Sequence, residues 1–209
     1  MTDWRVPAAA WWSSPDWHAY EALHDGPPGT RARLLASATW QTRVIDLEPS
    51  VPGLWAGVRK SYHSLIHRAE ERDHFAPCSA AEFPVDCREV HRLASGHVTR
   101  SQETWDLMGE WIKTGTAMAM CAWPSDPYDS RPSAYALWIG AQDWRYYASG
   151  ASLEDDLQHA VIWHSLIELK ARGVRCAELG WQGEATTEKG RGIEKFKAGF
   201  GGVDVDARL

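Results

Sequence analysis

Residues 176–202 read CAELGWQGEATTEKGRGIEKFKAGFGG, and this stretch is the most informative part of the chain for both fold and function. An apolar strand is expected to end at Leu179, and a polar connection rich in Gly follows it. A short helix then comes before the final glycines. Ile193, Phe196 and Phe200 lie at i, i+3 and i+7, which predicts that one side of this helix faces the core.

The same helix carries a local concentration of positive charge. Lys189, Arg191, Lys195 and Lys197 are accompanied by one acid, Glu194, in a chain whose formal net charge is -6. A positive cluster in an acidic protein favours a place where a phosphate or carboxylate is received. The alternative is a solvated, charged turn, and residue types alone leave both interpretations open.

Length and composition indicate one ordinary globular domain. The 209 residues suit a main domain over residues 37–209, preceded by a Trp-rich arm or reduced extension over residues 1–36. No apolar run approaches the roughly 18 residues of a membrane span, so no membrane insertion is expected. The N-terminus has no secretory signal layout, and the four Cys form no C-x-x-C pair, so reduced thiols and a cytoplasmic location are expected. The sequence does not determine the oligomeric state.

The periodicity of the apolar residues predicts helices on both sides of a sheet. The expected class is α/β (α+β), with a mixed, mostly antiparallel sheet flanked by helices on both faces. The elements expected are strands at 38–47, 116–123, 133–139, 144–149 and 174–179, and helices at 54–72, 86–95, 99–114 (opened by a Thr99–Gln102 capping box) and 152–172 (capped by Ser152).

Histidine and cysteine patterns predict no metal site. His63 and His67 could form half of a zinc site, but no suitably spaced third ligand follows them, so surface imidazoles are expected. His164 lies in a helix covered on most sides and is expected to be a satisfied core histidine. Cys121 and Cys176 lie in apolar strands, which favours buried packing over a nucleophilic role.

Several segments of residues 40–202 resemble the C-terminal half of the FemABX peptidoglycan-bridge aminoacyltransferases, which have the GNAT (N-acetyltransferase) fold. The most specific segment is IEKFKAGFGG at 193–202. The supporting segments are RKSYHSLI at 59–66, Gly96-x-x-Thr-Arg-Ser101, WIKTG at 111–115, YYASGAS at 146–152 and Glu178-Leu-Gly180.

This resemblance implies transfer of an aminoacyl group from aminoacyl-tRNA to an amine, with the tRNA acceptor end as a partner and no further cofactor. Family members usually have two GNAT-like domains, and this chain has room for one. A small-molecule amine, such as a natural-product intermediate, is therefore expected as acceptor rather than a peptidoglycan precursor, which stays an alternative. A second alternative is an acetyl-CoA-dependent N-acetyltransferase, and a third is a non-catalytic binding module.

The loop that precedes the helix at 152–172 helps to decide between the two possible acyl donors, aminoacyl-tRNA and acetyl-CoA. Coenzyme A enzymes place the pyrophosphate on backbone amides at the corresponding helix start. Here residues 149–156 read SGASLEDD, with one Gly and no Arg or Gln. The three acids Glu154, Asp155 and Asp156 are expected in the first helical turn, where they would repel a pyrophosphate. This pattern favours tRNA over coenzyme A.

The resemblance also implies roles for individual residues. Lys197 and Phe196 correspond to the place where the family stabilises the developing oxyanion and the leaving 3′ end. Arg100, at the head of its helix and free to point into a cleft, and Tyr147 correspond to acceptor-binding positions, and Tyr147 rather than Tyr146 is expected to face the cleft. The remaining candidates for substrate binding are Ser149 and Glu178 for the amine, and Lys189, Arg191 and Lys195 for the tRNA phosphates.

Overall fold

The computed structural model describes residues 40–126, 131–140, 143–182 and 187–207; the expected N-terminal arm, residues 1–36, lies outside them. Seven strands form a single sheet in the order β2-β3-β4-β5-β6-β1-β7. Every neighbouring pair is antiparallel except β5 and β6, which are parallel. The expected mixed, mostly antiparallel sheet is confirmed.

Helices and strands follow one another along the chain. The strands are β1 (Trp40–Asp46), β2 (Asp73–Pro77), β3 (Ala117–Pro124), β4 (Ala134–Ile139), β5 (Trp144–Ser152), β6 (Cys176–Gln182) and β7 (Val203–Ala207), and the helices are α4 (Val51–Gly57), α5 (Lys60–Glu70), the π-helix η1 (Phe83–Cys87), α6 (Arg88–Ser95), α7 (Gln102–Lys113), α8 (Leu157–Ala171) and α9 (Glu188–Ala198).

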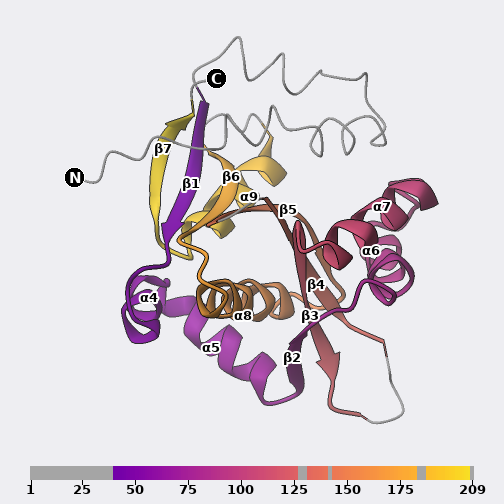
Figure 1. The fold of residues 1–209 in the computed structure, drawn as a ribbon. Coiled ribbons are helices and arrows are strands. Elements are labelled where there is room, and N and C mark those ends of the chain that lie inside the picture. Colours follow the sequence, from indigo (N-terminus) through magenta and orange to yellow (C-terminus); the bar gives the residue numbers. More distant parts are fainter. Residues whose placement is uncertain (1–39, 127–130, 141–142, 183–186, 208–209) are drawn as a thin grey trace.

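Helices cover both faces of the sheet and give it two separate cores (Figure 1). On one face, α8 packs on β3 and β4, and α5 packs against α8 and β2, around Ile66, Trp138 and Leu166. On the other, η1, α6 and α7 pack around Phe83 and Trp105. Strands β3 and β4 are buried along most of their length, as strands covered on both faces must be.

One expected helix is two helices in the structure. The helical pattern over residues 54–72 is interrupted at Val58, whose backbone is extended (ψ 137°). The next residue, Arg59, donates its backbone N–H to the carbonyl of Gly199 at 2.8 Å. The break between the two helices therefore contacts the residue that directly follows α9. Side-chain periodicity missed the break because Leu54, Val58 and Tyr62 are all buried on either side of it.

Two helix starts were also predicted wrongly. Ser101, and not Thr99, caps α7 by accepting a hydrogen bond from the Thr104 amide. Ser152 is the last residue of β5, and α8 begins only at Leu157 with Asp156 as its N-cap residue. Strands β2 and β7 were not anticipated, since each is short and partly polar at the edge of the sheet.

Candidate functional site

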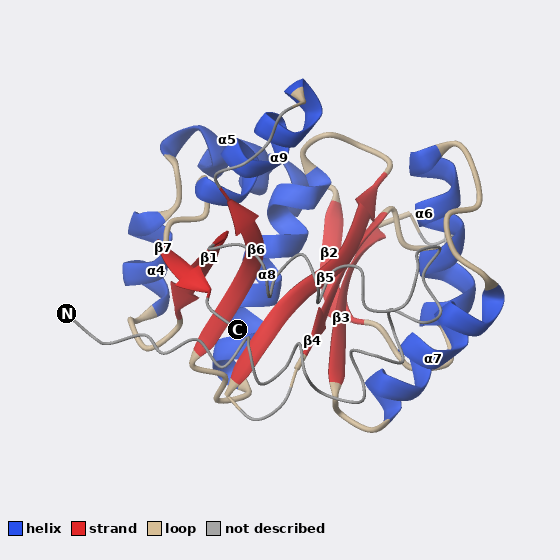
Figure 2. Ribbon diagram, turned by 90° about the horizontal axis from the view of Figure 1, so that it is seen from above, coloured by secondary structure: helices blue, strands red, loops and turns tan. Residues whose placement is uncertain are grey.

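The sheet opens between β5 and β6, the two strands that pair in parallel in the described part of the chain. Strand β5 pairs with β6 at three positions, the last of them Tyr146 opposite Glu178, although each strand continues beyond it. Figure 2 shows α8 passing behind the place where the two strands part. The opening separates the second half of β5 from the second half of β6, and the candidate site lies at this point.

The first turn of α8 contacts both sides of the opening. Its Gln158 donates a hydrogen bond to the Tyr147 hydroxyl (3.1 Å) and another to the backbone carbonyl of Tyr135 (3.3 Å). Its neighbour His159 packs edge-on against the Phe196 ring of α9, with centroids 5.0 Å apart. The fold thus brings the predicted residues Tyr147 and Phe196 to the same helical turn.

Helix α9 is held in place through its C-terminal end. The Tyr62 hydroxyl of α5 donates to the backbone carbonyls of Phe196 (3.2 Å) and Lys195 (3.4 Å). A Cβ at Gly199 would overlap the Tyr62 ring, so this approach requires glycine. Burial raises the pKa of Tyr62, and the nearby Arg59 guanidinium opposes that shift. Tyr62 therefore stays a neutral donor at physiological pH.

The cationic residues are distributed around α9 rather than along one face. Lys189, Arg191 and Lys195 are exposed, whereas Lys197 is half-buried beside Phe196. Lys195 and Lys197 lie in the last turn, where positive charge also stabilises the helix dipole. The predicted inward face is wrong at Ile193, which is 46% exposed, and correct at Phe200, which is buried.

A second polar chain crosses the opposite face of β5. The Arg100 guanidinium lies 3.3 Å from His91 Nε2, His91 Nδ1 lies 2.8 Å from the Tyr135 hydroxyl, and that hydroxyl lies 2.8 Å from Ser149 Oγ. Two bridging side chains therefore link the predicted residues Arg100 and Ser149. His91 and Tyr135 could not be predicted as part of this chain, because neither a histidine in a helix nor a tyrosine in an apolar strand indicates by itself which side chain it contacts.

Arg100 is enclosed rather than free, which corrects the expectation for its guanidinium. Only 9% of the residue is exposed, and its charge lies 5.6 Å from the centre of the Trp105 ring. Its Nε has no hydrogen-bond partner among the described residues. A buried donor without a partner costs free energy.

Glu178 is held inside the sheet by two hydrogen bonds. One carboxylate oxygen accepts from the Thr42 hydroxyl (2.6 Å) and the other from the Trp144 indole (3.0 Å). The residue is 1% exposed. Tyr146, which the sequence analysis does not place in the cleft, lies against Gly180. A Cβ at Gly180 would approach the Tyr146 hydroxyl to 3.1 Å. Tyr146 therefore lies at the point of divergence, and Tyr147 on the α8 side.

The acids before α8 differ from their expected placement. Glu154, Asp155 and Asp156 precede the helix instead of forming its first turn. Arg72 binds both Glu154 (2.9 Å) and Asp156 (2.9 Å), and Asp156 is buried. Because Arg72 pairs with Glu154 and Asp156, and Arg68 lies 3.8 Å from Asp156, the predicted repulsion of a pyrophosphate is weaker than the sequence indicates.

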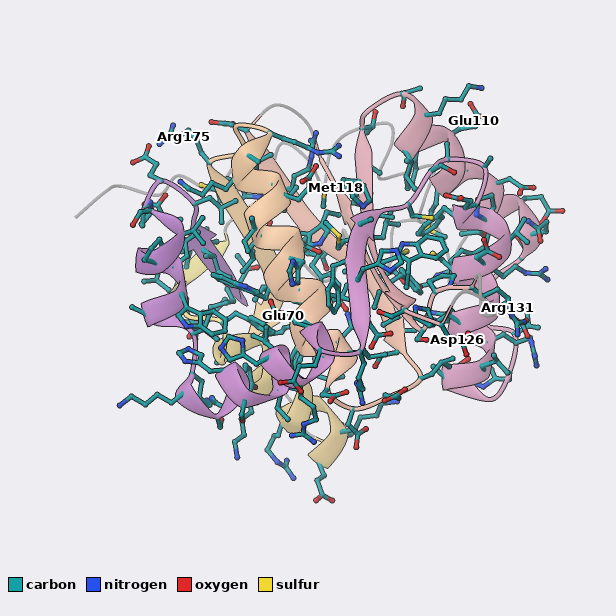
Figure 3. All side chains as sticks on the ribbon, turned by 90° about the horizontal axis from the view of Figure 1, so that it is seen from below. Glu70, Glu110, Met118, Asp126, Arg131 and Arg175 are labelled. Atoms are coloured by element: carbon teal, nitrogen blue, oxygen red, sulfur yellow. The ribbon has the colours of Figure 1, made fainter. Side chains whose placement is uncertain are left out.

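The other histidines and cysteines considered in the sequence analysis take no part in this site. His63 stacks on Trp55 at 4.0 Å and is half-buried, so the expected surface imidazole is wrong there, whereas His67 is exposed. Burial lowers the pKa of His164, which bonds Glu70 at 3.0 Å where α5 meets α8 (Glu70 is labelled in Figure 3). Cys121 and Cys176 are buried, as predicted.

Comparison with solved structures identifies the architecture. FemX superposes with a TM-score of 0.67 at 11% sequence identity, over 79% of this chain and 59% of that one. The fold is FemABX-like, of the GNAT type. L-PGS from Bacillus licheniformis shares this FemABX-like fold (TM-score 0.58, 12% identity, 80% of this chain and 59% of that one). So does the C-terminal domain of a protein described as a lysylphosphatidylglycerol synthetase, from Agrobacterium fabrum (TM-score 0.55, 11% identity, 80% and 58%).

The chain spans just under three-fifths of each of these FemABX-like structures. No family model and no curated protein matches the sequence. In the described part of the chain, no helix is long and apolar enough to cross a membrane.

Proposed function

We propose that the chain is an acyltransferase that moves an amino acid from aminoacyl-tRNA to the amine of a small-molecule acceptor and forms an amide bond. The observation that carries the proposal is the docking of Phe196, the neighbour of Lys197 in α9, against His159 in the first turn of α8, beside the opening between β5 and β6. The FemABX-like fold supports an acyl-transfer site at this place. One neighbour is named for lysylphosphatidylglycerol, an aminoacylated product, which supports an aminoacyl donor.

The reaction is aminolysis of an ester. The acceptor nitrogen attacks the aminoacyl carbonyl carbon, and the carbonyl oxygen becomes an oxyanion. The half-buried Lys197 ammonium would stabilise this charge in a site partly closed to water, where such an interaction is stronger than in bulk solvent. The bond to the ribose oxygen then breaks, and that oxygen takes up the proton that the amine loses.

The exposed cations of α9 suit the nucleic-acid part of the donor. Lys189, Arg191 and Lys195 extend the positive charge of the site outward, which is the arrangement that contacts phosphates of an acceptor stem. The acceptor would be oriented by Tyr147, which shares the first turn of α8 with Phe196. In this proposal Arg100 and Ser149, on the opposite face of β5, act indirectly by fixing that strand through His91 and Tyr135.

The test supplies the protein with tRNA, synthetases and labelled amino acids, and follows label into a small-molecule extract. Lys197→Met is expected to lower turnover by about 10²-fold or more if it stabilises the oxyanion. Lys113→Met is the matched control, because Lys113 lies on α7 in an exposed ion pair with Glu110 and should leave turnover unchanged. Full activity of Lys197→Met in a folded protein would remove this lysine from the mechanism.

A coenzyme A-dependent N-acetyltransferase is the second candidate, and the position of Arg72 favours it. Because Arg72 pairs with Glu154 and Asp156, and Arg68 lies near Asp156, the start of α8 repels a pyrophosphate less than the sequence indicates. Acetyl-CoA should then raise the melting temperature clearly at concentrations above its Kd. A shift with acetyl-CoA, together with no transfer from charged tRNA, would decide for this candidate.

A further inference from the structure

Three of the four cysteines converge in the core beneath η1 and α6. Cys78 directly follows β2, Cys87 is the last residue of η1, and Cys121 lies within β3. Their sulfur atoms all lie within 4.8 Å of one another. The fourth, Cys176, belongs to a separate cluster with Val44 and Trp144. Convergence of thiols from three separate elements is not required by apolar packing, for which any small side chain suffices.

The sulfur spacing fits a metal–thiolate centre. A cation bound at the usual zinc–sulfur length of about 2.3 Å holds its sulfurs about 3.8 to 4.0 Å apart. Cys87 and Cys121 are 3.5 Å apart and no pair exceeds 4.8 Å, so small side-chain rotations reach this spacing. A disulfide needs about 2.05 Å between two sulfurs and would leave the third without a role.

The backbone around the three thiols is firmly placed. The Cys78 amide bonds the Ala119 carbonyl at 2.9 Å, and Cys121 pairs with Ala76 in the ladder between β2 and β3. Cys87 is carried by a π-helix, a rare element that is frequent at functional sites. Its extra residue per turn changes the direction in which the thiol points.

The centre is also closed to water. Cys78, Cys87 and Cys121 are 4%, 0% and 0% exposed, respectively, so a solvent molecule has little access as a fourth ligand. Among the described residues, no other His, Cys, Asp or Glu joins the group. A three-sulfur set without oxygen or nitrogen donors selects soft cations over magnesium or calcium.

We propose that Cys78, Cys87 and Cys121 bind one thiophilic closed-shell cation, of the Cu(I) or Zn(II) type, which clasps β2, η1 and β3 together. On loading, the thiols release their protons to solvent and become thiolate ligands, with no change in oxidation state. The site is separate from the opening between β5 and β6, so its role is to stabilise the fold. It does not depend on the proposed acyl transfer.

The experiment uses the full chain, reduced and stripped of metal under anaerobic conditions, and titrates it separately with Zn(II) and with Cu(I). Metal per chain is measured after gel filtration. One equivalent is expected, with a rise in melting temperature of about 5 to 10 °C at a hundredfold excess over Kd. The ion that binds more tightly identifies the natural class, and either ion at one equivalent supports the site.

Variants and a wild-type measurement make the test decisive. Cys78→Ser and Cys121→Ala should lose the bound equivalent, while Cys176→Ala, a buried cysteine outside the cluster, should keep it. Should Cys121→Ala fail to fold, Cys78→Ser decides the point, because its loss of the bound metal is compared with retention by Cys176→Ala. Less than half an equivalent bound by the wild type, equal binding by Cys78→Ser, or a Cys87–Cys121 disulfide in the reduced preparation would overturn the proposal.

Discussion

At the scale of single residues, Gly150 of β5 is a position where a larger side chain has no room. A Cβ there would overlap the Tyr147 hydroxyl and approach Gln158 Nε2 to 2.8 Å and the Tyr135 carbonyl oxygen to 2.9 Å. The carbonyl belongs to the central strand β4 and cannot move aside. We expect Gly150→Ala to destabilise the protein by about 1 to 3 kcal/mol, as overpacking does, and to displace Tyr147. Denaturant unfolding measures the first effect.

Gly192 provides the matched control for Gly150. It lies within α9, and a Cβ there meets nothing within 4 Å. Gly192→Ala should stabilise the protein by up to about 1 kcal/mol, because alanine has the higher helix propensity. Equal effects of the two substitutions would show that the close contacts at Gly150 carry no cost.

The lowered pKa values of two histidines predict how the stability of the protein depends on pH. Burial lowers the pKa of His164, and likewise that of His159, because the charged imidazolium loses hydration. The unfolded chain, with a pKa of about 6.5, then binds more protons than the native state. This contribution to stability is complete above about pH 7 and is lost as the pH falls from about 6.5 through the lowered native pKa values.

The variant His164→Gln tests this pH dependence. Glutamine can still hydrogen-bond Glu70 but does not titrate, so the decrease in melting temperature between about pH 7 and pH 5 should be smaller than in the wild type. The stack of His164 on Phe75, 4.3 Å between centroids, is lost at every pH and only offsets the curve. If the melting temperatures of the wild type and of His164→Gln fall in parallel with pH, His164 does not contribute to the pH dependence.

At the scale of elements, the docking of α9 on α5 controls the position of Lys197. The Tyr62 hydroxyl holds the last carbonyls of α9, so Tyr62→Phe removes that anchor and keeps the ring. We expect a loss of about 1 kcal/mol and faster amide hydrogen exchange in α9 than in the wild type. Amides of α8 serve as the internal control, and unchanged exchange in both helices would mean that the ring alone holds α9.

Helix α9 also illustrates what sequence patterns can and cannot predict. Its existence, its cations and the inward side chains of Phe196 and Phe200 follow from spacing. The exposure of Ile193 does not, because α9 lies at the rim of the sheet and only its C-terminal half meets α5 and α8. Likewise, the start of α8 is set by the ion pairs of Asp156 with Arg72, and a partner 84 residues away leaves no local signal.

At the scale of the whole molecule, the site depends on where the sheet divides. The alternation of apolar residues predicted the layers and most strands correctly. It could not predict that β1 returns to pair with β6 and β7, or that β5 and β6 share only three pairs. Those non-local pairings decide which residues are brought together. Tyr147 and Phe196 both contact the first turn of α8, while Arg100 and Ser149 are linked through His91 and Tyr135 on the other face.

Glu178 connects the two halves of this divided sheet, and its substitution tests whether that connection is structural. Its carboxylate accepts from Trp144 of β5 and Thr42 of β1, on either side of β6. Glu178→Ala would leave two buried donors without an acceptor, so we expect a loss of about 2 to 5 kcal/mol in unfolding free energy. Glu168→Ala, which breaks an exposed pair with Arg172 on α8, should cost at most about 0.5 kcal/mol. If Glu178→Ala instead unfolds like the wild type and only turnover falls, the carboxylate acts on the substrate amine and the hydrogen bonds to Trp144 and Thr42 do not hold the sheet together.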